Sequence, residues 1–168
     1  MHMTSKERVM AAFDIGNDFG GQTGPLIGDD LFRRFMAPHL KRLIDLGHDY
    51  GLKVLMHCCG GFAPLIPVMI EIGLDGVQSL QPTCRDMEPE KLKDEFGDQI
   101  MLMGSIDTQM IIETNPDLVK AETRRVLEIM KPGGGYIASP SHDYVLPETP
   151  VENGLAVYKV IREYGFYN

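Results

Sequence analysis

Hydrophobic and polar positions follow two alternating patterns along the chain. Short apolar runs that contain β-branched residues end in Gly, Pro, Asn or Asp, and amphipathic stretches of helical length follow them. The apolar runs predict strands near residues 13–17, 53–57, 76–80, 100–105 and 136–140. The amphipathic stretches predict helices near residues 29–50, 62–72, 88–96, 116–130 and 150–164.

Individual residues mark the ends of the predicted helices. Asn115-Pro116 is a typical helix start, and residues 149–152 have the order of a capping box, with Thr149 as the capping residue. Pro38 lies inside the first predicted helix and is expected to kink or split it. Glycine follows four of the helices and predicts their ends, at Gly51, Gly73, Gly97 and Gly165.

The regular alternation of strand and helix predicts an α/β fold made of repeated βα units with parallel strands. Such units build either an open doubly wound sheet or part of a (β/α)8 TIM barrel. Residues 133–135 are three glycines, but they follow a helix and precede a strand, so we expect a turn there and not a phosphate-binding loop. No linker divides the chain, which favours a single domain over residues 1–168.

Composition and charge narrow the function classes. The chain has 16 Lys and Arg against 24 Asp and Glu, a net charge of −8, which argues against nucleic acid as a partner. No apolar run approaches the roughly 18 residues that cross a membrane, and the N-terminal residues lack the apolar stretch of a signal peptide. Two of the three cysteines are adjacent, which favours free thiols and a cytoplasmic location.

Side chains that can take part in catalysis or bind a ligand follow every predicted strand. In βα proteins, functional residues gather at the carboxyl ends of the strands. Asp18, Asp107 and His142 are therefore the candidate catalytic residues, and Gln22 and Gln81 are the candidate cofactor-binding residues.

The segment His57-Cys58-Cys59 is the sharpest local motif. His57 and Cys59 are two apart on an extended strand end, so their side chains point the same way, and imidazole and thiolate are suitable ligands for Zn²⁺. His142 is the natural third ligand, Asp18 or a water is the fourth, and Cys84 is an alternative to His142. The competing interpretation is that His57 only forms hydrogen bonds.

Two further candidates have alternative interpretations. His142 and Asp143 form a general acid/base pair or, equally, belong to a loop in which His142 caps a turn. Asp107 binds a cationic group or ring N–H donors, or it caps the next helix.

At these motifs the chain resembles the uroporphyrinogen decarboxylase superfamily, most closely its branch of zinc- and cobalamin-dependent methyltransferases. The resemblance spans most of residues 14–166, in family order, and rests on residues 17–27, 55–60, 104–109, 134–142 and 147–153. It implies a (β/α)8 barrel with its site at the carboxyl ends of the strands.

The resemblance also implies functional residues. The family's His-x-Cys zinc ligands map onto His57 and Cys59, and a further family ligand, a Cys near the last strand, maps onto His142. In the decarboxylases, that last position is a His near the substrate, without metal. The expected function is methyl transfer with a zinc-activated thiol and a corrinoid on a partner protein. The alternatives are decarboxylation of a tetrapyrrole and a catalytically inactive half-barrel that only binds a metal, a ligand or another chain.

One departure from the family concerns length. Residues 1–13 look like the start of a family member, whereas the chain from residue 14 resembles the middle of the barrel. The first strands, with the decarboxylase's N-terminal Arg-rich signature and catalytic Asp, are missing. We therefore expect a truncated barrel of about five βα units, which cannot close a barrel of the usual size of about 250 residues. Its open edges favour a homo-oligomer.

Overall fold

The computed structural model describes residues 12–167 and contains the five predicted strands as one parallel sheet. The strands are β1 (Ala12–Gly16), β4 (Lys53–His57), β5 (Gly76–Leu80), β6 (Met101–Ile106) and β7 (Tyr136–Pro140). Their order in the sheet is β1-β4-β5-β6-β7, which is also their order along the chain. Most of the predicted N-terminal segment, residues 1–13, lies outside the described residues.

The first predicted helix is split, as Pro38 indicates. It consists of α2 (Asp29–Leu31), a π-helical turn η1 (Phe32–Met36) and α3 (Ala37–Asp49). Pro38 lies in the first turn of α3 and has no N–H to donate to the turn before it, and that turn is the one with π-helical hydrogen bonding.

The remaining helices follow the predicted order. They are the 3₁₀ turn η2 (Ala63–Leu65), α4 (Ile66–Glu71), α5 (Pro89–Phe96), α7 (Pro116–Met130) and α8 (Val151–Tyr164). Two elements were not predicted, the short helix α6 (Thr108–Glu113) and a hairpin of β2 (Gly20–Gly21) and β3 (Gly24–Pro25).

Most predicted helix ends agree with the structure. Asn115 caps α7, since its side-chain oxygen accepts hydrogen bonds from the N–H groups of Asp117 and Leu118. The predicted capping box at α8 is wrong. Pro150 is the residue before the helix, its backbone stays extended (ψ 128°), and no side chain caps this end. The glycines at 133–135 all have positive φ and form the predicted turn.

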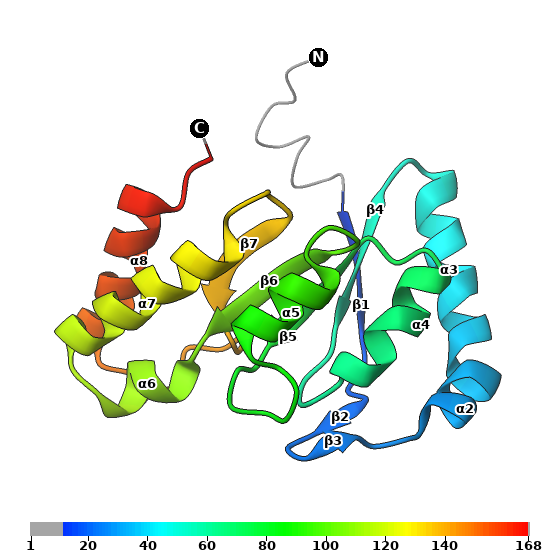
Figure 1. Cartoon of the computed structure of the whole chain (residues 1–168), viewed down its shortest axis with the longest axis horizontal. Coiled ribbons are helices and arrows are strands. Elements are labelled where there is room, and N and C mark those ends of the chain that lie inside the picture. Colours follow the sequence, from blue (N-terminus) through cyan, green and yellow to red (C-terminus); the bar gives the residue numbers. More distant parts are fainter. Residues whose placement is uncertain (1–11, 168) are drawn as a thin grey trace.

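The helices cover one face of the sheet (Figure 1). Alternate strand residues, among them Val54, Met56, Val77 and Leu102, are buried against the helices. The intervening residues, which point to the opposite face, are half-buried or exposed: Leu55, Gln78, Met101, Met103 and Ile137. In a closed barrel this second face is the packed interior. The fold is therefore a partial (β/α)8 barrel, in which β1 and β7 are open edges.

Within residues 12–167, the structure contains no helix that is both long enough and apolar enough to span a bilayer.

Candidate metal centre

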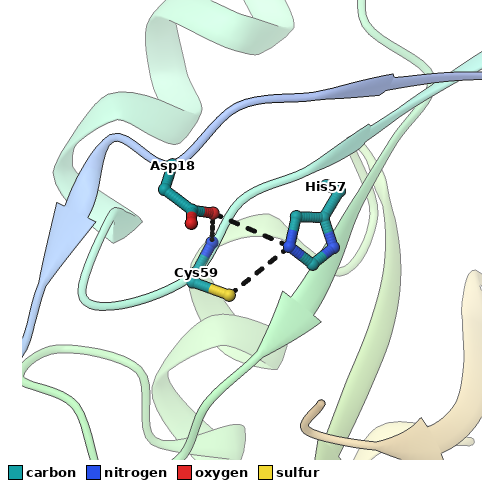
Figure 2. A group of neighbouring side chains, drawn as sticks. All are labelled: Asp18, His57 and Cys59. Atoms are coloured by element: carbon teal, nitrogen blue, oxygen red, sulfur yellow. Dashed lines mark hydrogen bonds and ion pairs between the residues drawn. The ribbon is translucent and has the colours of Figure 1, made fainter. Parts of the chain in front are cut away.

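Three potential metal ligands meet at the carboxyl ends of β1 and β4. Figure 2 shows Asp18 from the loop after β1, His57 at the end of β4 and Cys59 two residues further on. The ligand atoms of these residues all lie within 4.8 Å of one another. We call these residues the triad. In the part of the chain from 12 to 167, the triad is the single group of three or more acidic, His or Cys residues that satisfies this distance.

The register between β1 and β4 brings Asp18 close to His57 and Cys59. β1 and β4 are adjacent and parallel, with Gly16 beside His57, and the N–H of Asn17 donates to the carbonyl of His57 at 3.1 Å. Parallel neighbours end at the same edge of the sheet, so the loop that carries Asp18 begins beside His57. The His57 and Cys59 side chains converge as the alternation of the strand predicts.

A backbone contact then fixes the two loops. A Cβ built at Gly20 would lie 2.4 Å from the carbonyl oxygen of Cys59, and one at Gly60 would lie 2.4 Å from the carbonyl carbon of Gly20. Only glycine fits this approach, and Gly60 also has a positive φ of 81°. The contact allows the N–H of Cys59 to donate to Oδ1 of Asp18 at 2.9 Å.

Apolar packing also fixes the loop that carries Asp18. The Phe19 ring, next to Asp18, meets the buried Phe32 ring edge-on, with centroids 5.1 Å apart. The Phe19 N–H donates to the sulfur of Cys58, which is completely buried. Cys58 is therefore part of the hydrophobic core, while the side chain of its neighbour Cys59 faces the site.

The two distances from His57 to the other triad residues match those between neighbouring ligands of a zinc ion. Nε2 of His57 is 3.4 Å from Sγ of Cys59 and 3.6 Å from Oδ1 of Asp18. Zinc bonds of about 2.0–2.3 Å in tetrahedral geometry place neighbouring ligand atoms about 3.3–3.8 Å apart. A nitrogen, a thiolate sulfur and a carboxylate oxygen form a donor set that zinc accepts, and three protein ligands leave one position open, as in catalytic zinc sites.

The thiols of the site are neutral in the metal-free chain. Burial, reinforced by the negative charge of Asp18, raises the pKa of Cys59 to about 11. Burial also raises the pKa of Cys58, to about 12. A metal ion bound there would reverse this preference at Cys59, because coordination favours the thiolate.

A second carboxylate, that of Asp143, lies next to the other ring nitrogen of His57. Nδ1 of His57 is buried and lies 2.9 Å from Oδ2 of Asp143, although the contact lacks the alignment of a hydrogen bond. The other oxygen of Asp143 accepts a hydrogen bond from the hydroxyl of the buried Ser79 at 3.1 Å. Asp143 thus faces the ring nitrogen that the triad does not use. The sequence placed Asp143 next to His142 and gave no sign of its contact with His57.

Gln22 and Gln81, the predicted cofactor-binding residues, lie together beside the triad. Oε1 of Gln81 accepts a hydrogen bond from the N–H of Gly60 at 2.9 Å. The thiol of Cys84 lies 3.5 Å from Oε1 of each glutamine. The buried Cys84 is therefore held by two amides and is not part of the triad.

The structure does not bring His142 to the triad. Nδ1 of His142 accepts a hydrogen bond from the N–H of Tyr144, so this histidine stabilises its own loop. Asp18 occupies the place next to His57 and Cys59 that the sequence assigned to His142 as third ligand. Asp107 caps α6, because its carboxylate accepts from the N–H of Gln109 at 3.0 Å.

Two clefts open at this edge of the sheet, and His142 lines both. The polar cleft, of about 570 Å³, is lined by Gln22, Gln81, Thr83, Asp107, Thr108, Gln109, Ile112, Glu113, Ser141, His142 and Leu146. The apolar cleft, also of about 570 Å³, lies between β7 and α8 and includes Met103, Asp143, Tyr144, Val157 and Tyr158. Four predicted site residues, Gln22, Gln81, Asp107 and His142, thus share the polar cleft.

Comparison with protein families gives a match along nearly the whole chain. The sequence profile of the uroporphyrinogen decarboxylase (URO-D) family matches residues 9–164. The chain belongs to the uroporphyrinogen decarboxylase family. A search of curated proteins found no match to this URO-D family member.

Among solved structures, this URO-D chain is similar to a methyltransferase from Methanosarcina mazei. The two share 23% sequence identity with a TM-score of 0.71, over 92% of this chain and 42% of the other. At this identity the similarity shows the fold. The URO-D chain spans less than half of the length of that methyltransferase, as the partial barrel requires.

Proposed function

We propose that this URO-D family chain binds zinc through Asp18, His57 and Cys59 and takes part in transferring a methyl group to a thiol. The observation that carries the proposal is the convergence of three chemically different ligand atoms within 4.8 Å. When bound, zinc supplies Lewis-acid chemistry, which lowers the pKa of a coordinated thiol to give a nucleophilic thiolate at neutral pH.

The residues of the chain have separate roles in this proposal. The carboxylate of Asp143 holds the His57 ring so that Nε2 faces Asp18 and Cys59. Gln22 and Gln81 contribute amide groups to the polar cleft where a substrate or cofactor enters. Asp107 and His142 line the same cleft and bind or move protons on the substrate there.

A corrinoid carried by a separate protein is the proposed methyl donor. The carboxyl edge of the sheet is accessible from outside, because both clefts open there and Tyr144 and Val145 beside the apolar cleft are exposed. A bulky donor can therefore approach the triad from that side.

Charge argues for this proposal over decarboxylation of a tetrapyrrole. Uroporphyrinogen carries eight carboxylates, which a binding site must neutralise with cations or donors. None of the residues that line the two clefts, all within 12–167, is Lys or Arg.

The proposal is tested by mixing zinc-loaded protein with methylcobalamin and 2-mercaptoethanol and following the loss of the methylcobalamin absorbance. We expect turnover with the wild-type chain and a loss of at least 100-fold with Cys59→Ala, because the variant lacks the thiolate ligand. Bound zinc without turnover would contradict methyl transfer and favour a binding module. Carbon dioxide release from uroporphyrinogen by metal-free protein would favour decarboxylation.

A further inference from the structure

Apolar surface gathers on the helices at the two open ends of the sheet. Among residues 12–167, the exposed large apolar side chains of helices lie almost entirely on the stretch from α2 to α3 and on α8. In the same part of the chain, α4, α5 and α6 have none, and α7 has one, Leu118. Figure 1 shows α3 and α8 at opposite ends of the molecule. Apolar surface that is confined to these ends indicates a contact that the single chain does not make.

The first of these surfaces, which we call the α3 flank, consists of Phe35, Leu43 and Leu46. All three side chains are exposed, and their spacing places them on one side of the helical stretch. Another side of the stretch faces α4, because Arg33 pairs with Glu71 at the end of α4. The α3 flank therefore lies toward β1, where the sheet has no further strand.

The second surface, which we call the α8 flank, consists of Val151, Leu155 and Tyr158. These exposed side chains also follow one another at helical spacing. Another side of α8 packs against α7. Tyr158 lines the apolar cleft beside β7, the strand at the other open edge of the sheet. Each open edge of the sheet is thus bordered by an apolar flank without a neighbouring helix.

Charged groups at the ends of the two flanks determine the direction in which they fit together. The stretch from α2 to α3 has Arg34 near its start and Asp49 at its end. Conversely, Glu148 lies just before α8, and Arg162 lies in its last turn. None of these four exposed residues forms an ion pair with another residue between 12 and 167. If the helices pack parallel, as neighbouring helices of a βα barrel do, an acid meets a base at both ends. If they pack antiparallel, like charges meet.

The apolar area is sufficient for a stable dimer. Further exposed apolar side chains border the two flanks: Phe13, Leu31 and Tyr50 at one edge, and Ile137, Tyr144 and Val145 at the other. With these neighbours, each edge offers on the order of 500 Å² of apolar surface, since a large aromatic side chain covers about 150–250 Å². Two contacts between such edges bury about 2,000 Å², which is the size of a stable protein interface.

We propose that a second copy of the chain covers both edges, with the α8 flank and β7 of one copy beside the α3 flank and β1 of the other. A two-fold axis parallel to the strands makes the two contacts equivalent. The two five-stranded sheets then form one parallel ring, and each copy supplies the wall of the barrel mouth that the other lacks. This inference does not depend on a metal ion or on methyl transfer.

Sedimentation velocity of the metal-free chain measures the dissociation constant of the dimer. Leu46→Glu in the α3 flank and Tyr158→Glu in the α8 flank should each weaken the dimer at least tenfold, because each places a charge in an apolar contact. Leu118→Glu on α7 is the matched control, since Leu46 and Leu118 are both 50% exposed. We expect the control to dimerise like the wild type. A loss from only one of the two flanks, or an equal loss in the control, would overturn the proposal.

Variants with exchanged charges test the direction of packing without changing the net charge. Arg34→Glu/Asp49→Lys reverses the ends of the α3 flank, and Glu148→Lys/Arg162→Glu reverses those of the α8 flank. At low salt, each variant alone should dimerise at least tenfold more weakly than the wild type, because attraction becomes repulsion at both contacts.

An equal mixture of the two variants should form a heterodimer with nearly the wild-type affinity, because each contact then again joins opposite charges. A monomeric wild type at high concentration would overturn the proposal. So would a charge-exchanged variant that dimerises like the wild type, or a mixture that does not recover.

Discussion

The contact between Asp143 and His57 gives the proposed metal site a supporting carboxylate. A histidine ligand is held in one orientation and tautomer when its second nitrogen faces such a group. Asp143 lies 2.9 Å from Nδ1 of His57 and is itself held by the hydroxyl of Ser79. We predict that Asp143→Asn weakens zinc binding by about 10–100-fold. Competition with a chromophoric chelator measures the affinity.

The control for this prediction is Asp45→Asn, which removes an exposed carboxylate that pairs with Lys41 on α3. We expect its zinc affinity to equal that of the wild type, and both variants to unfold at the wild-type urea concentration. An unchanged affinity in Asp143→Asn would show that Asp143 does not orient His57.

At the scale of residues, the sequence predicted that His57 and Cys59 converge, and it offered Asp18 only as an alternative to water in the fourth position, behind His142. Side-chain alternation on a strand was enough to bring His57 and Cys59 together. The choice between Asp18 and His142 could not be made from spacing, because the contact of Gly20 with Gly60 positions Asp18 and is a tertiary feature. Asp143 was missed because a loop has no period from which its side-chain direction follows.

At the scale of elements, the two glycine loops are the most constrained part of the site. Gly60 combines a positive φ with a contact that leaves no room for a Cβ. We predict that Gly60→Ala lowers the free energy of unfolding by at least about 2 kcal/mol, from backbone strain and from the displaced loop. Urea denaturation measures the change.

Gly154 provides the comparison, because it lies in α8, has ordinary helical backbone and has open space where a Cβ would be. Gly154→Ala should be neutral or stabilise the protein by up to about 1 kcal/mol. Equal effects at Gly60 and Gly154 would contradict the account of the loop contact.

Asp75 joins three elements and makes stability depend on pH. Burial alone would raise the pKa of Asp75, but hydrogen bonds from Lys53, the N–H of Val54 and His48 outweigh it and lower the pKa. A lowered pKa in the folded state means that the contribution is complete above the usual value of 3.8 and is lost as the pH falls below it.

We predict that Asp75→Asn costs about 1–3 kcal/mol at pH 7. The difference between variant and wild type should shrink as the pH falls below about 4. Thermal unfolding across this pH range tests the prediction. A difference that is constant with pH would show that the charge of Asp75 contributes nothing.

Element type was well predicted where segments are long and periodic. The five strands and the helices α5, α7 and α8 agree with their predicted ranges to within two residues. The helix α6 and the β2–β3 hairpin were missed because six-residue and two-residue elements are too short to show a period. The capping box at Thr149 failed because the extended backbone of Pro150 delays the helix by one residue.

At the scale of the whole molecule, the open concave face predicts self-association. The edge strand β7 leaves Ile137 46% exposed, and Leu55, Met101 and Met103 on the same face are only half-buried. Parallel sheets are normally covered on both faces. We predict that sedimentation velocity finds dimers or larger oligomers at micromolar concentration, and that Ile137→Lys shifts them toward monomer. A monodisperse wild-type monomer at high concentration would contradict this.

The sequence also predicted the architecture correctly. Alternation of strands and helices left two α/β folds open, and the family motifs selected the partial barrel that the structure contains. Sequence patterns cannot show how an incomplete barrel covers its open face, because that depends on contacts outside the single chain.

The metal content of the purified protein tests the central claim most directly. Elemental analysis of protein prepared without an affinity metal should find about one zinc per chain in the wild type and in Cys84→Ser, and none in Cys59→Ser. Cys84 is the matched control because it is a buried thiol beside the site that lies outside the triad. Absence of zinc from the wild type, or its retention in Cys59→Ser, would contradict the assignment of Asp18, His57 and Cys59 as a metal centre.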